Sequence, residues 1–208
     1  MKAPTYVIEH GQTAMDKRGL VHGPAHAAEP LDREGRRQAV ALGARLRRLK
    51  PGRIYTSPAR RAQMTGAIAG VVAGVPVETA AELASLDTGA LGQGDQVDVA
   101  RRLKPYFADP GRRIPGGETV QAWRARHLDC MRRVAARAKQ RGERPPAFVT
   151  HSNVVGSALA AARGGSADAG RKAMAQPPPP AVAHQVSFSA GTGPAQLKQR
   201  WPGGPRKP

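Results

Sequence analysis

Two histidines and one arginine follow short apolar runs in this sequence of 208 residues. They are His10 after the run 5–9, Arg61 shortly after the run 53–56, and His151 after the run 147–150. In α/β proteins the carboxyl ends of parallel strands meet at one edge of the sheet and present reactive side chains there. Phosphoryl transfer needs a nucleophile and cationic groups around the phosphate oxygens, which histidine and arginine can supply. One such histidine is weak evidence, but three stretches together indicate a functional site.

These side chains need a framework in which strands alternate with helices. The apolar pattern predicts strands at 5–9, 53–56, 75–79, 147–150 and 184–189. It predicts helices from Asp32 to Pro51, from Ser57 onwards, at 97–107, from 117 to 142 and at 153–161. Asp32 and Ser57 are expected to cap the helices that follow them, because their side-chain oxygens can accept free amide protons of the first turn. Alternation of this kind predicts an α/β fold, a three-layer α/β/α sandwich with a mostly parallel central sheet.

The chain is long enough for one domain with a sizeable core, which we place at residues 1–190. Residues 163–181 are poor in apolar side chains and end near four consecutive prolines, so they are expected to form a mobile loop. Residues 191–208 are rich in Gly, Pro, Lys and Arg, and this composition predicts a disordered basic tail.

The three stretches resemble motifs of the histidine phosphatase superfamily, also called the phosphoglycerate mutase-like family. Glu9-His10-Gly11 resembles the family's first motif, Arg-His-Gly, and Gln12 and Thr13 continue the usual pattern. Other segments that resemble motifs of this family are Pro30–Ala39, Ser57–Ala62, Pro115–Thr119 and the pair Thr150-His151. The resemblance extends from about Tyr6 to Ser189, nearly the whole chain, and it implies a phosphoglycerate mutase-like fold.

The resemblance also implies roles for the matching residues. His10 would attack phosphorus and become a phosphohistidine, while Arg61 and His151 would hold the phosphoryl oxygens, together with Gln12 and Thr13. Water would then release phosphate. The implied activity is a phosphomonoester hydrolase that needs neither a metal ion nor another cofactor, and no cluster with metal-ligand spacing stands out in the sequence.

The proton donor of this family lies in the region that corresponds to residues 82–92. Aligning on Gly89 puts Ser85 where many members carry an acidic residue, so the register is ambiguous. The carboxyl groups at hand are Asp87 and Glu82, and we favour Asp87 because it stands next to the glycine turn. The alternative, that Asp87 is only a turn residue, stays open.

Glu9 is the main departure from the family pattern, because a phosphate-binding arginine is expected there. A carboxylate beside the nucleophile would repel a dianionic phosphate by about 1 to 4 kcal/mol at contact distance, depending on the dielectric. Three hypotheses follow. In the first, the enzyme retains activity, with Lys17, Arg18 or Arg60 compensating and with Glu9 orienting His10 or pairing with Arg61. In the second, the fold is a catalytically impaired module that binds an anion, nucleic acid or a partner. In the third, Glu9 is an altered residue in an ordinary enzyme.

The net charge of +18, from 33 Lys and Arg against 15 Asp and Glu, predicts an anionic partner. The coding bias towards Ala, Arg, Gly and Pro also accounts for many of the arginines. No zinc-finger spacing or aromatic-studded basic strand supports nucleic-acid recognition. We therefore expect a phosphorylated small molecule or a phosphoprotein as partner, with nucleic acid as the alternative of another class. The sequence leaves the oligomeric state open.

The single cysteine, Cys130, cannot form an intramolecular disulfide, which fits a reducing compartment. The N-terminus lacks an apolar signal core, and glycines and a proline interrupt the longest apolar run, near residues 67–77. These features predict a cytoplasmic protein that does not span a membrane.

Overall fold

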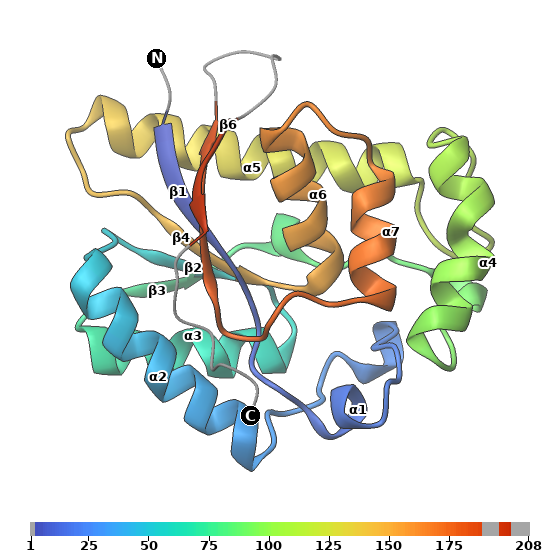
Figure 1. Cartoon of the computed structure of the whole chain (residues 1–208), viewed down its shortest axis with the longest axis horizontal. Helices are drawn as coiled ribbons and strands as arrows, with labels where there is room; N and C mark the ends of the chain where they lie inside the picture. Colours follow the sequence, from blue (N-terminus) through green and yellow to red (C-terminus); the bar gives the residue numbers. More distant parts are fainter. Residues whose placement is uncertain (1–2, 189–195, 201–208) are drawn as a thin grey trace.

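The computed structural model describes residues 3–188 and 196–200, and in these residues a six-stranded sheet forms the centre of the molecule (Figure 1). The strands are β1 (Ala3–Glu9), β2 (Ile54–Thr56), β3 (Val77–Thr79), β4 (Ala147–Thr150), β5 (Ala183–Phe188) and β6 (Gln196–Arg200). Their order across the sheet is β3-β2-β4-β1-β5-β6, and the first four run parallel. β5 runs antiparallel to β1, and β6 runs antiparallel to β5. The mostly parallel sheet predicted from the sequence is confirmed.

Helices cover both faces of the sheet and complete the predicted three layers (Figure 1). They are α1 (Ala14–Lys17), α2 (Arg33–Leu49), α3 (Arg60–Ala73), α4 (Gln96–Ala108), α5 (Val120–Gln140), α6 (Ser152–Ala162) and α7 (Asp168–Ala175). Short 3-10 turns lie at Pro24–His26, Ala81–Leu83 and Gly89–Leu91. Successive residues of β1 serve opposite faces, as the period of a strand requires. Ile8 joins the core under α2 and α3, whereas Val7 joins the larger core under α5 and α6.

Helix α2 begins as predicted, whereas the start of α3 differs from the prediction. Asp32 caps α2, and its Oδ1 accepts a hydrogen bond from the Gly35 amide at 2.7 Å. Ser57 was expected to cap the next helix, but α3 begins at Arg60 and its N-cap is Ala59, which makes no side-chain cap. The Ser57 hydroxyl accepts a hydrogen bond from the Ala59 amide at 3.3 Å, just before the helix, and it also lies 2.7 Å from a ring nitrogen of His151.

The expected loop at residues 163–181 contains the helix α7, so that prediction is wrong for its central part. α7 packs against α6 and α4 rather than standing in solvent (Figure 1). Gly170 permits a close approach to α6 and to the Trp123 ring of α5, because a Cβ at this position would lie 2.9 Å from the Asn153 carbonyl oxygen and 2.7 Å from that ring. A smaller difference concerns β3, which begins at Val77 rather than at residue 75.

Part of the predicted disordered tail is a strand. Residues 196–200 form β6, which pairs with β5 at the edge of the sheet. The edge of β5 offers unpaired backbone groups, and a neighbouring strand satisfies them through backbone hydrogen bonds. The other residues of the expected tail, 191–195 and 201–208, lie outside the described residues. Among the residues that are described, no helix combines the length and apolar character needed to cross a bilayer.

His127 lies on the buried face of α5. Its side chain is fully buried, Nδ1 donates a hydrogen bond to the Trp123 carbonyl oxygen at 2.7 Å, and Nε2 lies 3.1 Å from the Ser157 hydroxyl. Because a carbonyl only accepts, Nδ1 carries the ring proton and Nε2 accepts from Ser157. Burial lowers the pKa of His127 to about 3, so folding favours its neutral form.

We predict that His127 makes the folded state sensitive to acid. Its pKa is about 3 when folded and near 6.5 when unfolded, so its contribution to stability is complete above pH 6.5 and is lost progressively towards pH 3. Between these limits, each unit by which the pH is lowered should reduce the free energy of unfolding of the parent by about 1.4 kcal/mol more than that of His127→Leu. Urea unfolding at pH 7, 6 and 5 measures both slopes, and equal slopes would contradict the assignment.

Candidate active site

The carboxyl ends of β1, β2 and β4 lie side by side and bring the three predicted stretches together. β4 stands between β1 and β2 in the parallel part of the sheet. The His10 amide donates to the Thr150 carbonyl oxygen at 3.0 Å, and the Ser57 amide donates to the Val149 carbonyl oxygen at 2.9 Å. This register places the residues that follow each strand at one edge, where His10 and His151 have ring centroids 5.4 Å apart.

The backbone after His10 is held by close packing against the first turn of α2. A Cβ on Gly11 would lie 2.6 Å from the Gly35 carbonyl oxygen, and a Cβ on Gly35 would overlap the backbone of Gln12. The Gln12 amide also donates to Gln38 Oε1 at 2.8 Å. The two glycines of the matching motifs therefore let this turn and α2 approach closely, which fixes the direction of His10.

His10 is buried and is bound through both ring nitrogens. Nδ1 lies 2.8 Å from the Gly11 carbonyl oxygen, and because a carbonyl oxygen only accepts, Nδ1 carries the proton. Nε2 keeps its lone pair and accepts a hydrogen bond from Arg61 Nε at 3.2 Å. Burial and the charge of Arg61 lower the pKa of His10 to about 3. His10 is therefore a neutral imidazole near pH 7, and its Nε2 can attack an electrophile.

Arg61 connects the two histidines from the first turn of α3. Besides His10 Nε2, it donates to His151 Nδ1 at 3.3 Å and to the carbonyl oxygen of His26 at 3.1 Å. These acceptors are all neutral, and Arg61 forms no ion pair with any residue that the structure describes. A buried cation of this kind is well placed to bind an anion.

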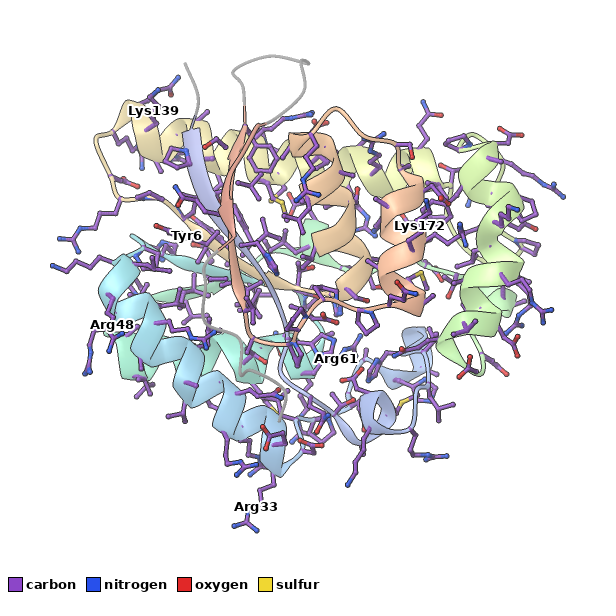
Figure 2. The ribbon with its side chains drawn as sticks, viewed as in Figure 1. Tyr6, Arg33, Arg48, Arg61, Lys139 and Lys172 are labelled. Carbon is purple, nitrogen blue, oxygen red and sulfur yellow. The ribbon has the colours of Figure 1, made fainter. Side chains whose placement is uncertain are left out.

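The charge of Arg61 persists despite its burial. The side chain lies inside the molecule and is 3% exposed, whereas Arg33 and Arg48 project outwards from α2 (Figure 2). Burial lowers the pKa of Arg61 to about 10, and the neighbouring carboxyl groups of Asp16, Glu29 and Glu9 oppose that change. Arg61 therefore stays protonated near pH 7, unlike the imidazoles beside it.

His151 is held in one tautomer by Arg61 and Ser57. Its Nδ1 accepts from Arg61, so Nε2 carries the proton and donates to the Ser57 hydroxyl at 2.7 Å. Burial, then the charge of Arg61, lowers the pKa of His151 well below its usual value. Sequence reasoning missed this use of Ser57, because a serine before a proline indicates a helix cap rather than a partner 94 residues away.

Glu9 lies at the end of β1 and is 6% exposed. Its Oε2 is buried and has no hydrogen-bond partner among the described residues. Burial and the nearby Asp16 raise the pKa of Glu9 well above its usual value, while Arg61 opposes that rise. Glu9 lines a small cavity of about 40 Å³ together with His10, Asp16 and Arg61. The unusual residue of the first motif therefore faces the site itself.

Asp16 and His22 border the same cavity, although neither is among the site residues predicted from the sequence. Thr13 caps α1, and both its amide and its hydroxyl lie 2.9 Å from Asp16 Oδ2. The Thr13 hydroxyl also lies 2.8 Å from His22 Nε2. Thr13 thus contacts these two side chains, and Gln12 is placed by its backbone, so the substrate-binding roles of Thr13 and Gln12 stay predictions.

The ligand atoms of His10, Asp16 and His22 all lie within 4.8 Å of one another, which is close enough to consider a metal ion. Sequence spacing did not indicate this cluster, because the loop 11–22 folds back on itself. The expectation that no ligand cluster exists is therefore wrong as a statement about geometry.

The two candidate proton donors lie in different surroundings. Asp87 lines a second cavity of about 290 Å³ with Arg61 and His151, and its Oδ1 accepts from the Gly89 amide at 3.0 Å. Glu82 is half exposed and forms an ion pair with Arg133 at 3.3 Å. Asp87 therefore lies at a cavity beside Arg61 and His151, as a proton donor would, whereas Glu82 does not. The hydrogen bond to Gly89 also agrees with the alternative in which Asp87 is a turn residue.

The segment that carries Asp87 is fixed by an ion pair that sequence reasoning did not identify. Arg126 lies 2.6 Å from Glu118, and it also donates to the carbonyl oxygens of Glu82, Ala84 and Ser85. Glu118 in turn accepts from the Asp87 amide at 2.9 Å. The Pro115–Thr119 motif therefore positions the residues around Asp87 through Glu118. In the sequence, the glutamate of this motif is the residue that could have indicated this contact.

Comparison with known proteins places this arrangement in a family. A profile of the histidine phosphatase superfamily (branch 1) matches residues 5–193 of the chain. A curated relative from Klebsiella pneumoniae, named probable phosphoglycerate mutase GpmB, is 31% identical over 121 residues, which are 56% of this chain and 55% of that protein. The chain therefore spans about half the length of the curated relatives it matches.

Solved structures share the fold over nearly the whole chain. The mycobacterial glucosyl-3-phosphoglycerate phosphatase Rv2419c in complex with VO3 is 22% identical, covers 94% of this chain and 96% of its own, and has a TM-score of 0.70. Phosphoglycerate mutase from Bacillus anthracis str. Sterne is 16% identical, covers 95% and 92%, and has a TM-score of 0.73. These likenesses concern the fold, and the extent of the profile match establishes that the chain belongs to the histidine phosphatase superfamily.

Proposed function

We propose that this protein is a phosphomonoester hydrolase that acts through a phosphohistidine on His10 and needs no metal ion. Membership of the superfamily, with phosphatases and mutases among the relatives, supports a phosphatase-type activity. The observation that carries the proposal is Arg61, a buried cation whose hydrogen bonds all go to neutral acceptors beside a neutral histidine. A phosphoryl group at this point would supply the missing negative charge and place phosphorus near the His10 lone pair.

The first chemical step follows from the tautomer of His10. The Nε2 lone pair forms a bond to phosphorus while the ester P–O bond breaks, and the ring becomes positively charged. The Nδ1–H bond to the Gly11 carbonyl oxygen stabilises that charge. Arg61 moves from the ring nitrogens to the phosphoryl oxygens, and the carboxyl group of Asp87 gives a proton to the leaving alcohol.

The second step returns the enzyme to its starting state. Water attacks phosphorus, the N–P bond breaks, and Asp87 takes a proton from the water. The amino end of α6, where Ser152 and Asn153 line the cavity, adds backbone amides and a favourable dipole for the phosphoryl oxygens. The adjoining cavity of about 290 Å³ has room for a compact leaving group, so a phosphorylated small molecule is the favoured substrate over a phosphoprotein.

A second candidate function is the binding of an anion or a partner protein without turnover, and the presence of Glu9 is the observation that supports it. The ionised form of Glu9 would oppose a phosphate dianion at the nucleophile. Its raised pKa reduces this effect, because a buried glutamic acid that keeps its proton adds no negative charge. We therefore favour retained phosphatase activity.

The decisive measurement is hydrolysis of an aryl phosphate by the purified protein and by His10→Ala. We expect turnover in the parent and a loss of at least ~10³-fold in His10→Ala, because the variant lacks the Nε2 lone pair that forms the bond to phosphorus. Rapid quenching with ³²P-labelled substrate should trap an acid-labile phosphoprotein in the parent only. Equal turnover of the two proteins would refute the role of His10.

The inhibitory effect of Glu9 should grow with pH. Below its raised pKa the residue is neutral, and above it the carboxylate repels the substrate, so Glu9→Gln should gain activity relative to the parent as the pH rises. The ratio of kcat/KM for the variant and the parent should approach about tenfold, the factor given by ~1.4 kcal/mol of repulsion. Glu143→Gln, an exposed substitution, is the matched control. A ratio that stays constant with pH contradicts this effect.

Substrates with different leaving groups can show whether Asp87 or Glu82 is the proton donor. Asp87→Asn should lower kcat at least ~10²-fold for alkyl phosphates, whose leaving oxygen needs a proton, and much less for nitrophenyl phosphate. Glu82→Gln should behave like the parent with both, because it lies outside the two cavities. The reverse pattern would move the proton donor to Glu82.

A further inference from the structure

His10, Asp16 and His22 surround a gap that is too wide for hydrogen bonds and suited to a bridging cation. His10 Nδ1 lies 3.9 Å from Asp16 Oδ2, and His22 Nδ1 lies 3.7 Å from Asp16 Oδ1. Ligand atoms in a tetrahedral zinc site, with bonds of about 2.0–2.1 Å, lie roughly 3.3–3.4 Å apart. Movements well under ~1 Å at Asp16 would bring these two carboxylate–imidazole pairs to coordination distance, and the ligand atoms of the two histidines, which lie within 4.8 Å of each other, would also have to approach.

The surroundings of His22 resemble those of a metal-binding histidine. Its Nε2 lies 2.8 Å from the Thr13 hydroxyl, so the ring is fixed and Nδ1 is turned towards Asp16. Ligating imidazoles are commonly oriented in this way by a hydrogen bond at the other ring nitrogen. The His22 side chain is 8% exposed and that of Asp16 is 24% exposed, which leaves a path from solvent to the site.

Glu9 provides an independent indication that a cation belongs here. Its Oε2 is buried without a hydrogen-bond partner among the described residues, and it lines the same cavity as the three potential ligands. A buried carboxyl oxygen without a partner is costly, and a cation in the cavity would relieve that cost. Glu9 and Asp16 together offer two carboxyl groups against the single guanidinium of Arg61.

We propose that this cavity binds a divalent transition-metal ion, of the Zn²⁺ or Co²⁺ type, through His10, Asp16 and His22, with Glu9 beside the ion, and that the bound ion blocks phosphoryl transfer. Two imidazoles and a carboxylate favour such ions, whereas Mg²⁺ and Ca²⁺ prefer sites made of oxygen. The binding is independent of the proposed function, and the inhibition rests on it.

Inhibition follows because a neutral imidazole has one lone pair. His10 Nδ1 is the nitrogen nearest Asp16, and a metal ion there requires the ring proton to move to Nε2. Nε2 then has no lone pair for phosphorus, and its proton faces the Arg61 donor. A metal ion on Nε2 would occupy the nucleophile directly. Either mode makes metal and phosphate compete for one histidine.

The test is a titration of the full chain, first stripped with a chelator, with Co²⁺ and Zn²⁺ in the absence of substrate. Visible absorption should report a Co²⁺ site of low coordination number, and calorimetry should give one Zn²⁺ per chain. His22→Ala and Asp16→Asn should each weaken Zn²⁺ binding at least ~10-fold, and Glu9→Gln should also weaken it. Asp129→Asn, an exposed change on α5, should bind like the parent. Circular dichroism checks that each variant is folded.

The outcomes separate the two proposals. Zn²⁺ binding that is unchanged in folded His22→Ala and Asp16→Asn, or is absent from the parent, overturns the metal site whether or not the protein is a phosphatase. If binding occurs, micromolar Zn²⁺ should inhibit aryl phosphate hydrolysis competitively in the parent, and folded His22→Ala should need at least ~10-fold more. Inhibition that is equal in both proteins would overturn the link between this site and catalysis.

Discussion

The hydrogen bonds from Arg61 to His10 and His151 are the interaction on which the site depends. A guanidinium only donates, so each imidazole must offer it a bare nitrogen, and this requirement fixes both tautomers. The opposite nitrogens then donate to the Gly11 carbonyl oxygen and to Ser57. The order of β2, β4 and β1 serves this arrangement, because it places the three segments side by side at one edge of the sheet.

A charge imbalance follows from burying this arginine among neutral partners. The site contains a permanent cation that no carboxylate directly neutralises within the described residues, and two histidines whose lowered pKa values keep them neutral. An anion is the natural complement. Glu9 and Asp16 stand next to this cation without pairing with it, and only an ionised carboxylate there reduces the positive potential that a phosphate would meet. The substitution at position 9 therefore changes the electrostatics of the site and leaves its framework intact.

The sequence predicts the framework of this site better than its contacts. Strand ends are encoded locally, by apolar runs and the glycine turn, so the predicted sheet and the gathering of His10, Arg61 and His151 at one edge agree with the structure. Contacts across long separations leave no local signal: Ser57 reads as a helix cap but binds His151, and His22 approaches Asp16 only because the loop folds back. Strand β6 was missed for the same reason, since pairing with β5 outweighs its unfavourable composition.

Phosphate binding and metal binding both depend on one lone pair, that of His10, and Glu9, the departure from the family pattern, lines the same cavity. Phosphate binding requires Arg61 to leave Nε2 while the proton stays on Nδ1, whereas a metal ion on the Asp16 side requires the proton to move to Nε2. The two ligands therefore select opposite tautomers of the same ring. A carboxylate in this cavity strengthens the binding of a cation and weakens the binding of phosphate. Glu9 and Asp16 therefore shift the balance towards the tautomer that binds a metal ion. An arginine at position 9 would shift it towards the other tautomer.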